Sequence, residues 1–384
     1  MDREWAAIAS LFFVATPPVL TDPVLPDYGD ACVSRVVANC LDPEAAEATW
    51  IPHPLRGAEQ VVLLVLDGLG WEQLTARSSM APTLCAMEGG SITTVAPSTT
   101  STALTSIATG TPPGQHGVIV YRIAVDQEIL NVLRWSTPAG DARKHILPES
   151  IQREPPFAGE RPPVVTRAEF QGSGFTVAHL DGVRLTGYRT LGTLVAETQR
   201  HVDAGEPFVY VYYDGIDKVA HEYGFGPVYD AELRSVDRLV GDLLEVIGPQ
   251  ATLVVTADHG QVIVGDHVIE LDHEVLANVA YQSGEGRFRW LHARSGRAPA
   301  LLAEASARYS DDAWVVSVEQ IIDEGWFGPR VSEAAASRLG DVALVARTAV
   351  SFHDPNDSGP YQLIARHGSL TPAEMYVPLL ASRG

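Results

Sequence analysis

Cysteine is scarce in this sequence, and its scarcity excludes a cross-linked or cysteine-ligated protein. The chain of 384 residues has three cysteines, Cys32, Cys40 and Cys85, and no C-x-x-C pair. A disulfide framework and a cysteine zinc site are therefore not expected. A reducing compartment is the simpler expectation, so we predict a cytoplasmic protein, with secretion as the less favoured alternative.

Positive charge is scarce as well. The chain has 27 Lys and Arg against 48 Asp and Glu, which gives a formal net charge of −21 at pH 7. Nucleic acids and anionic membranes are bound by clustered Lys and Arg, so neither a nucleic-acid polymer nor a membrane is expected as a partner. A small molecule is the expected partner, and the oligomeric state stays open, with a homodimer as one alternative.

Long apolar stretches are missing too. Residues 5–20 are fairly apolar, but they are short for a membrane span and are interrupted by Pro17 and Pro18. Residues 2–4 do not form the basic region that begins a signal peptide. We expect a buried N-terminal segment, with a poor signal peptide as the alternative. The 46% of apolar and 20% of charged residues exclude a disordered or fibrous protein.

Continuous apolar runs predict the centre of the fold. Runs at residues 61–66, 208–213 and 252–256, and a weaker run at 176–180, each end at an acidic residue. Such runs are typical of strands that are buried on both faces. Residues 229–247 instead have the spacing of an amphipathic helix. This alternation predicts an α/β fold with a largely parallel central sheet and helices on both faces.

Residues 260–354 have a different pattern of shorter elements. The predicted elements are strands at 288–292, 314–318 and 344–347 and a helix at 298–309. We interpret this stretch as a small α+β cap that is inserted into the core. The core then comprises residues 1–259 and 355–384.

Acidic and histidine side chains gather at the predicted strand ends. The set is Asp67, Asp217, His221, Asp258, His259 and His367. The carboxyl ends of parallel strands meet at one edge of a sheet, where ligands bind. Asp217 and His221 are four residues apart, so a helix would project both to the same side. Three carboxylates and three imidazoles that converge would suit two divalent metal ions, and zinc is favoured over manganese or iron.

Each of these residues also has a common structural alternative. An Asp at a strand end often caps a turn or a helix. His267, His273 and His353 compete as metal ligands, and spacing does not exclude them. His116 is expected to be a loop histidine that is held by hydrogen bonds. A dinucleotide-binding G-x-G-x-x-G motif is incomplete, because Gln73 stands where the third glycine belongs.

In this order along the chain, the residues resemble the alkaline phosphatase superfamily, most closely its type I phosphodiesterase/nucleotide pyrophosphatase family. The resemblance runs from about Val61 to Leu380, apart from the cap. Gly110–Gly117 resembles the family's G-x-x-P-x-x-H-G segment, and ten residues before Gly110 the family's nucleophile falls on Thr100. The resemblance implies an alkaline phosphatase-like fold and two zinc ions. One would be held by Asp217, His221 and His367, and the other by Asp67, Asp258, His259 and the Thr100 oxygen.

The resemblance implies a phosphoric ester hydrolase that acts through a phosphothreonine on Thr100, most closely a phosphodiesterase or nucleotide pyrophosphatase. A threonine hydroxyl is a poor nucleophile, and coordination to a metal would activate it. Thr100 precedes a predicted helix at 101–109, whose first N–H groups favour an incoming phosphate. Two zinc ions and three carboxylates would leave about one positive charge, which a phosphodiester monoanion neutralises.

One position departs from the family pattern and keeps other activities open. The family usually has Asn three residues after the nucleophile, where this chain has Ala103. A phosphomonoesterase, a phosphonate hydrolase and a promiscuous phosphotriesterase are alternatives on the same core. So are a phosphomutase and a sulfate ester hydrolase, although a sulfatase normally needs Cys or Ser at the position of Thr100. The non-enzyme alternative is a catalytically silent binding module.

The substrate contacts are predicted less sharply than the metal ligands. Tyr121, His179 and Tyr213 are candidates for the pocket of the leaving group, and each has core packing as an alternative. A phosphomonoester dianion would need an added cation near Thr100, and the candidates are Arg122, Arg184 and Lys218.

Overall fold

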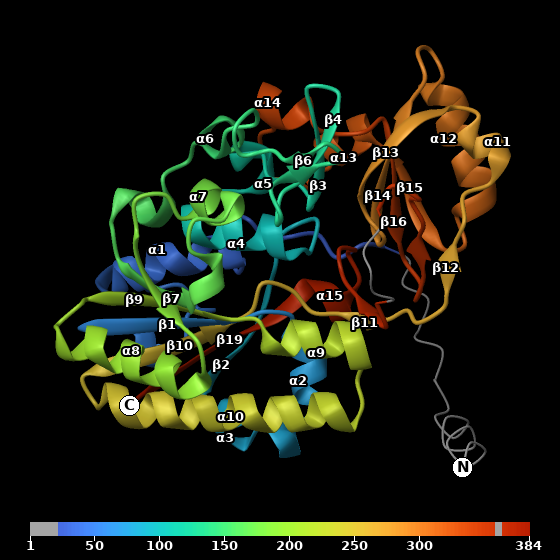
Figure 1. Cartoon of the computed structure of the whole chain (residues 1–384). Helices are drawn as coiled ribbons and strands as arrows, with labels where there is room; N and C mark the ends of the chain where they lie inside the picture. Colours follow the sequence, from blue (N-terminus) through green and yellow to red (C-terminus); the bar gives the residue numbers. More distant parts are fainter. Residues whose placement is uncertain (1–21, 358–362) are drawn as a thin grey trace, which may run out of the picture.

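The computed structural model describes residues 22–357 and 363–384 and is built on a seven-stranded sheet (Figure 1). Its strands are, in order, β2 (Glu88–Thr93), β19 (Tyr376–Arg383), β10 (Ala251–Thr256), β1 (Gln60–Leu66), β9 (Phe208–Tyr213), β7 (Pro163–Arg167) and β8 (Arg184–Tyr188). β19 alone runs opposite to the other six strands of this sheet, and every pairing without β19 is parallel. The predicted largely parallel sheet is therefore confirmed.

Helices cover the sheet on both faces (Figure 1). On one side lie α8 (Leu191–Asp203) and α10 (Pro227–Ile247), and on the other α1 (Val36–Leu41), α4 (Thr100–Thr109) and α7 (Gly174–His179). Every residue of β9 and β10 is buried, as expected for strands between two helical layers. The helix predicted at residues 229–247 is confirmed as α10.

The weak run at residues 176–180 is not a strand, and that prediction was wrong. The segment belongs to α7, where the Ser173 hydroxyl caps the helix by accepting from the Thr176 N–H at 3.1 Å. A short apolar run carries no periodicity that separates a buried strand from a buried helix. The strands β7 and β8 on this side of the sheet were not predicted.

A second, antiparallel sheet lies apart from the first (Figure 1). Its order is β13 (Val279–Glu285), β14 (Phe288–Ala293), β16 (Val342–Ala346) and β15 (Ala313–Ser317), and it is accompanied by α11 (His273–Leu276), α12 (Ala298–Tyr309) and α13 (Val318–Asp323). The elements predicted in this stretch are present. The boundaries of a cap at residues 260 and 354 stay a prediction.

A third sheet of four short strands was not predicted. It consists of β3 (Arg122–Val125), β4 (Glu128–Asn131), β5 (Ser136–Thr137) and β6 (Gly140–Asp141). The remaining α-helices are α2 (Trp71–Thr75), α3 (Pro82–Ala86), α5 (Pro113–His116), α6 (Pro148–Ile151), α9 (Gly215–Tyr223), α14 (Glu333–Ala336) and α15 (Pro372–Met375). Two further pairs of short strands are β11 (Val262–Ile263) with β18 (Ala365–Arg366) and β12 (Val268–Ile269) with β17 (Ser351–Phe352).

Two expectations concern the chain as a whole. The N-terminal segment at residues 5–20 lies outside the described residues. Cys32, Cys40 and Cys85 are unpaired in the structure. In the described part of the chain, no helix has the length and apolar character that crossing a bilayer requires.

A buried ion pair joins the second sheet to the core. Arg287, in the turn between β13 and β14, donates from Nε and Nη2 to the carboxylate of Glu374 in α15, at 2.7 and 2.8 Å. Both side chains are fully buried. Glu374 also accepts from the Ser369 N–H at 3.0 Å, and its backbone carbonyl accepts from the Gly260 N–H at 2.9 Å. This pair therefore fixes the two loops that carry His259 and His367.

We expect Arg287→Met to destabilise the protein strongly, because it leaves the Glu374 carboxylate buried without its partner. The expected loss in the free energy of unfolding is about 3–5 kcal/mol. Denaturant unfolding followed by circular dichroism measures it. The control is Arg308→Met, since the ion pair of Arg308 with Glu304 is partly exposed and its loss should change stability little. Equal stability of the two variants would contradict this role of the buried pair.

Candidate active site

The candidate ligands meet at the carboxyl edge of the central sheet. Asp67 follows β1, Asp217 and His221 lie in α9 after β9, Asp258 and His259 follow β10, and His367 follows β18. The helix α4 begins at Thr100 and faces the same place. The side chains of Asp67, Asp258 and His259 are almost completely buried.

One group of donors surrounds the Nε2 atom of His259. This atom is 3.4 Å from Asp67 Oδ1, 3.5 Å from Asp258 Oδ2 and 3.1 Å from the Thr100 hydroxyl. The two carboxylate oxygens are buried and have no hydrogen-bond partner among the described residues. Buried oxygens without partners are costly, and a divalent cation is the kind of partner that two carboxylates, an imidazole and a hydroxyl suit.

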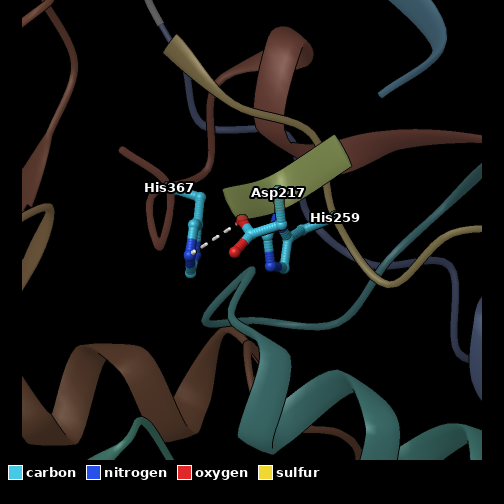
Figure 2. A group of neighbouring side chains, drawn as sticks. All are labelled: Asp217, His259 and His367. Carbon is cyan, nitrogen blue, oxygen red and sulfur yellow. Dashed lines mark ion pairs between the residues drawn. The ribbon is translucent and has the colours of Figure 1, made fainter. Parts of the chain in front are cut away.

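A second group surrounds Asp217. Its Oδ1 atom is 3.2 Å from His221 Nε2 and 3.9 Å from His367 Nε2. Figure 2 shows the Asp217 carboxylate with the rings of His259 and His367, and its dashed line marks the ion pair between Asp217 and His367. These two rings stack with centroids 3.7 Å apart, so the two groups adjoin each other.

The three histidines are oriented in the same way. Nδ1 of His221 is 2.7 Å from the Ala365 carbonyl, Nδ1 of His259 is 3.0 Å from that of Gly260, and Nδ1 of His367 is 3.1 Å from that of Ser98. A carbonyl only accepts, so each Nδ1 carries the proton and each Nε2 presents a lone pair to the site. Metal-binding histidines are typically held in this way.

The electrostatics of the site favour a cation. Burial raises the pKa of the Asp67 carboxyl well above its usual value, and the nearby carboxylates of Asp258 and Asp217 raise it further. Burial also raises the pKa of Asp217 and lowers that of His367 well below the ordinary value for histidine. A divalent cation favours ionised carboxylates and neutral imidazoles, which is the state that ligates metals.

Two residues that the sequence did not single out hold the carboxylates in place. The Gln261 amide donates to Asp217 Oδ1 at 2.7 Å, and the Tyr212 hydroxyl donates to Asp67 Oδ2. Gly68 leaves room for Gln261: its φ is +76°, and an added Cβ would lie 2.6 Å from Gln261 Nε2. Gln261 follows His259 by two residues, and this proximity is the signal that could have pointed to it.

The buried carboxylate of Glu285 also approaches the site. It comes from β13 of the second sheet, and its Oε2 atom is 3.8 Å from His367 Nδ1. No sequence signal marks Glu285, because it reaches the site through the packing of one sheet on the other.

A pocket of about 240 Å³ opens beside Thr100. Its lining is Asp67, Thr100, Leu104, Leu133, Val164, Thr166, Phe170, Ser173, Phe175, Thr176, His179, Leu180, Tyr210, Tyr212, Asp214, Asp217 and Lys218. Most of the exposed lining is apolar. The pocket therefore joins the candidate metal ligands to a mainly apolar and aromatic space.

Of the predicted substrate contacts, His179 and the candidate cation Lys218 line this pocket. Tyr213 lies outside this pocket, and its hydroxyl donates to Glu232 at 2.5 Å, so its contact with substrate stays a prediction. Successive strand residues face opposite sides, so Tyr212 lines the pocket instead.

Tyr121 and Arg122, at the start of the third sheet, are each held by an aspartate. The Tyr121 hydroxyl donates to Asp357, and the buried Arg122 guanidinium donates to Asp354 at 2.6 Å. Neither residue lines the pocket, and their contact with substrate stays a prediction.

The competing histidines lie elsewhere. His273 and His353 form partly exposed ion pairs with Glu274 and Glu270, and His267 is exposed. His116 is buried and held by hydrogen bonds, as predicted: its Nε2 is 2.8 Å from the Ser106 hydroxyl, and its Nδ1 accepts from the Val118 N–H. It ends the helix α5, so the prediction that it lies in a loop was wrong.

Known proteins resemble this chain in sequence pattern and in fold. The family model for type I phosphodiesterase / nucleotide pyrophosphatase matches residues 61–181 and 181–370. No curated protein sequence matches the chain. Murine ectonucleotide pyrophosphatase / phosphodiesterase 5 is 16% identical with a TM-score of 0.63, over 85% of this chain and 88% of that one. Phosphonoacetate hydrolase from Sinorhizobium meliloti 1021, in complex with phosphonoformate, is 18% identical with a TM-score of 0.60, over 85% and 91%. At these identities the two structures show a shared fold.

We expect Gln261→Met to weaken metal binding, because it removes the donor that orients Asp217 and keeps the volume of the side chain. The affinity for Zn²⁺ should fall by about 10-fold or more. Titration of the metal-free protein against a zinc-binding dye measures this affinity.

The matched control is Gln115→Met, at an exposed position of α5. Its Zn²⁺ affinity should equal that of the unmodified protein. If Gln261→Met bound Zn²⁺ as tightly as this control, the orienting role of Gln261 would be wrong.

Proposed function

Since the chain belongs to the type I phosphodiesterase/nucleotide pyrophosphatase family of the alkaline phosphatase superfamily, we propose that it is a two-zinc phosphodiesterase with Thr100 as its nucleophile. The observation that carries the proposal is the position of Thr100. Its hydroxyl lies at the start of α4, 3.1 Å from His259 Nε2 and beside the unpartnered oxygens of Asp67 and Asp258.

The residues divide into two sets of metal donors. One set is Asp67, Asp258, His259 and Thr100, and the other is Asp217, His221 and His367. Zinc bound by these sets would supply Lewis-acid chemistry, by stabilising the Thr100 alkoxide and the negative charge of the phosphate oxygens. Manganese and iron are alternatives with the same donors.

The chain itself contributes a phosphate cradle. The first N–H groups of α4 have no carbonyl partner within the helix, and they favour the oxygens of a bound phosphate. Ala103 is fully buried and offers no polar side-chain atom where the family usually has Asn. The backbone therefore takes a larger share in holding the phosphate than in relatives with that Asn.

Two in-line displacements complete the proposed reaction. In the first, the Thr100 oxygen attacks phosphorus and the ester oxygen of one alcohol leaves and takes up a proton. In the second, water attacks the phosphothreonine diester, and Thr100 leaves with its hydroxyl restored. The products are one alcohol and one phosphomonoester.

The cations favour a diester over a monoester. Arg122 is paired with Asp354 at 2.6 Å, Arg184 with Glu206 at 2.6 Å, and Lys218 with Asp214 at 2.5 Å. Each of the three is therefore paired with a carboxylate, which weakens its match to the second charge of a monoester. A phosphonate hydrolase is the alternative, because the chain shares its fold with phosphonoacetate hydrolase.

We expect the zinc-loaded protein to hydrolyse bis-p-nitrophenyl phosphate with a higher kcat/KM than p-nitrophenyl phosphate. Thr100→Ala should lower kcat for the diester by about 10³-fold or more, because the nucleophile is lost. Release of p-nitrophenolate measures both rates, and the metal content of each preparation is determined alongside. Thr105→Ala is the control within the same helix.

Two results would go against the proposal. Retention of more than a tenth of the activity by Thr100→Ala would show that another group attacks phosphorus. A preference for p-nitrophenyl phosphate would place the protein among the phosphomonoesterases.

A further inference from the structure

One buried hydrogen-bond acceptor stands in the apolar pocket beside Thr100. It is the ring of His179 in α7, which is 5% exposed and stacks on Phe175 with centroids 4.0 Å apart. His179 Nδ1 is 2.6 Å from the Phe175 carbonyl. Because a carbonyl only accepts, Nδ1 carries the proton and Nε2 carries a lone pair.

The Nε2 atom has no hydrogen-bond partner among the described residues. The protein does not enclose this atom completely. Since His179 lines the pocket, this nitrogen is open to a molecule bound there. Burial lowers the pKa of His179 to about 4, so the ring is neutral at pH 7. Its Nε2 atom therefore accepts a hydrogen bond and cannot donate one.

Two hydroxyls of the pocket wall already have partners within the protein. The Tyr212 hydroxyl donates to Asp67, and the Ser173 hydroxyl donates to Thr176 at 2.9 Å. A hydroxyl can rotate and either donate or accept, whereas an imidazole with a fixed proton cannot. His179 therefore discriminates between ligands more sharply than the hydroxyls around it.

The size and walls of the pocket limit what enters. Its volume of about 240 Å³ is below that of pockets that enclose a whole drug-sized ligand, so it accepts one ester group of the substrate. Phe170, Phe175, Tyr210 and Tyr212 give it aromatic walls, which favour a flat ring.

We propose that His179 is a specificity-determining residue, and that it selects phosphodiesters in which one ester group is an apolar ring bearing an N–H or O–H donor. This inference rests on the proposed phosphodiesterase function. A ring without the donor would leave Nε2 buried and unpaired, and that loss lowers the affinity of the transition state.

The test compares two substrates that differ by one donor. These are p-nitrophenyl phenyl phosphate and p-nitrophenyl aminophenyl phosphate, with the amino group at the 3 or the 4 position. We expect the zinc-loaded protein to favour one amino isomer over the phenyl ester by roughly 10-fold in kcat/KM. In His179→Phe, which keeps a ring on Phe175, the preference should fall to less than about twofold.

Further variants separate recognition from folding. His179→Gln retains an acceptor and should keep part of the preference, while the exposed His145→Phe should keep all of it. Binding gives a readout without catalysis: in Thr100→Ala, calorimetry should show tighter binding of aminophenyl phosphate than of phenyl phosphate. Adding His179→Phe should remove that difference.

The outcomes distinguish the two proposals. If both diesters are hydrolysed but the preference is absent, or persists in His179→Phe, the role of His179 is overturned and the phosphodiesterase function stands. If the zinc-loaded protein hydrolyses neither diester, the proposed function fails, and the inference that rests on it fails too.

Discussion

The burial of three carboxylates at one edge of a parallel sheet is the constraint on which the rest of the structure depends. Asp67, Asp217 and Asp258 are brought together because the strands that precede them run in the same direction. The negative charges of neighbouring carboxylates repel each other, and burial adds the cost of desolvation. Both costs are offset when a divalent cation lies between the carboxylates, so the sheet topology itself favours a metal centre.

The residues around the carboxylates fit this demand. Backbone carbonyls accept the Nδ1 protons of three imidazoles, which leaves each Nε2 facing the site. Gln261 donates to the Asp217 carboxylate, and Tyr212 donates to that of Asp67. The buried pair of Arg287 and Glu374 anchors the loops next to His259 and His367 through the N–H groups of Gly260 and Ser369. A donor set held by so many fixed bonds is pre-organised, which is what a nucleophile of low intrinsic reactivity requires.

Much of the architecture could be predicted from the sequence, because it depends on local patterns. Unbroken apolar runs marked β1, β9 and β10, and the acids at their ends marked the site. The run at 176–180 was misread because a short buried helix and a short buried strand have the same composition.

The substrate side could not be predicted in the same way. Tyr212 and Tyr213 are equivalent in the sequence, and only the pleat of β9 decides which one faces the pocket. Gln261 contacts Asp217, which is distant along the chain, and only its closeness to His259 in the sequence pointed to it. Glu285 reaches the site from another sheet, and neither periodicity nor spacing signals that contact.

The central claim is that hydrolysis proceeds through a covalent phosphothreonine, and the stereochemistry at phosphorus tests it most directly. Each in-line displacement inverts the configuration at phosphorus. A chiral phosphorothioate diester, hydrolysed by the zinc-loaded protein in water enriched in a heavy oxygen isotope, should therefore give a product with retained configuration. Inversion would show that water attacks the diester in a single step, and it would contradict the role assigned to Thr100.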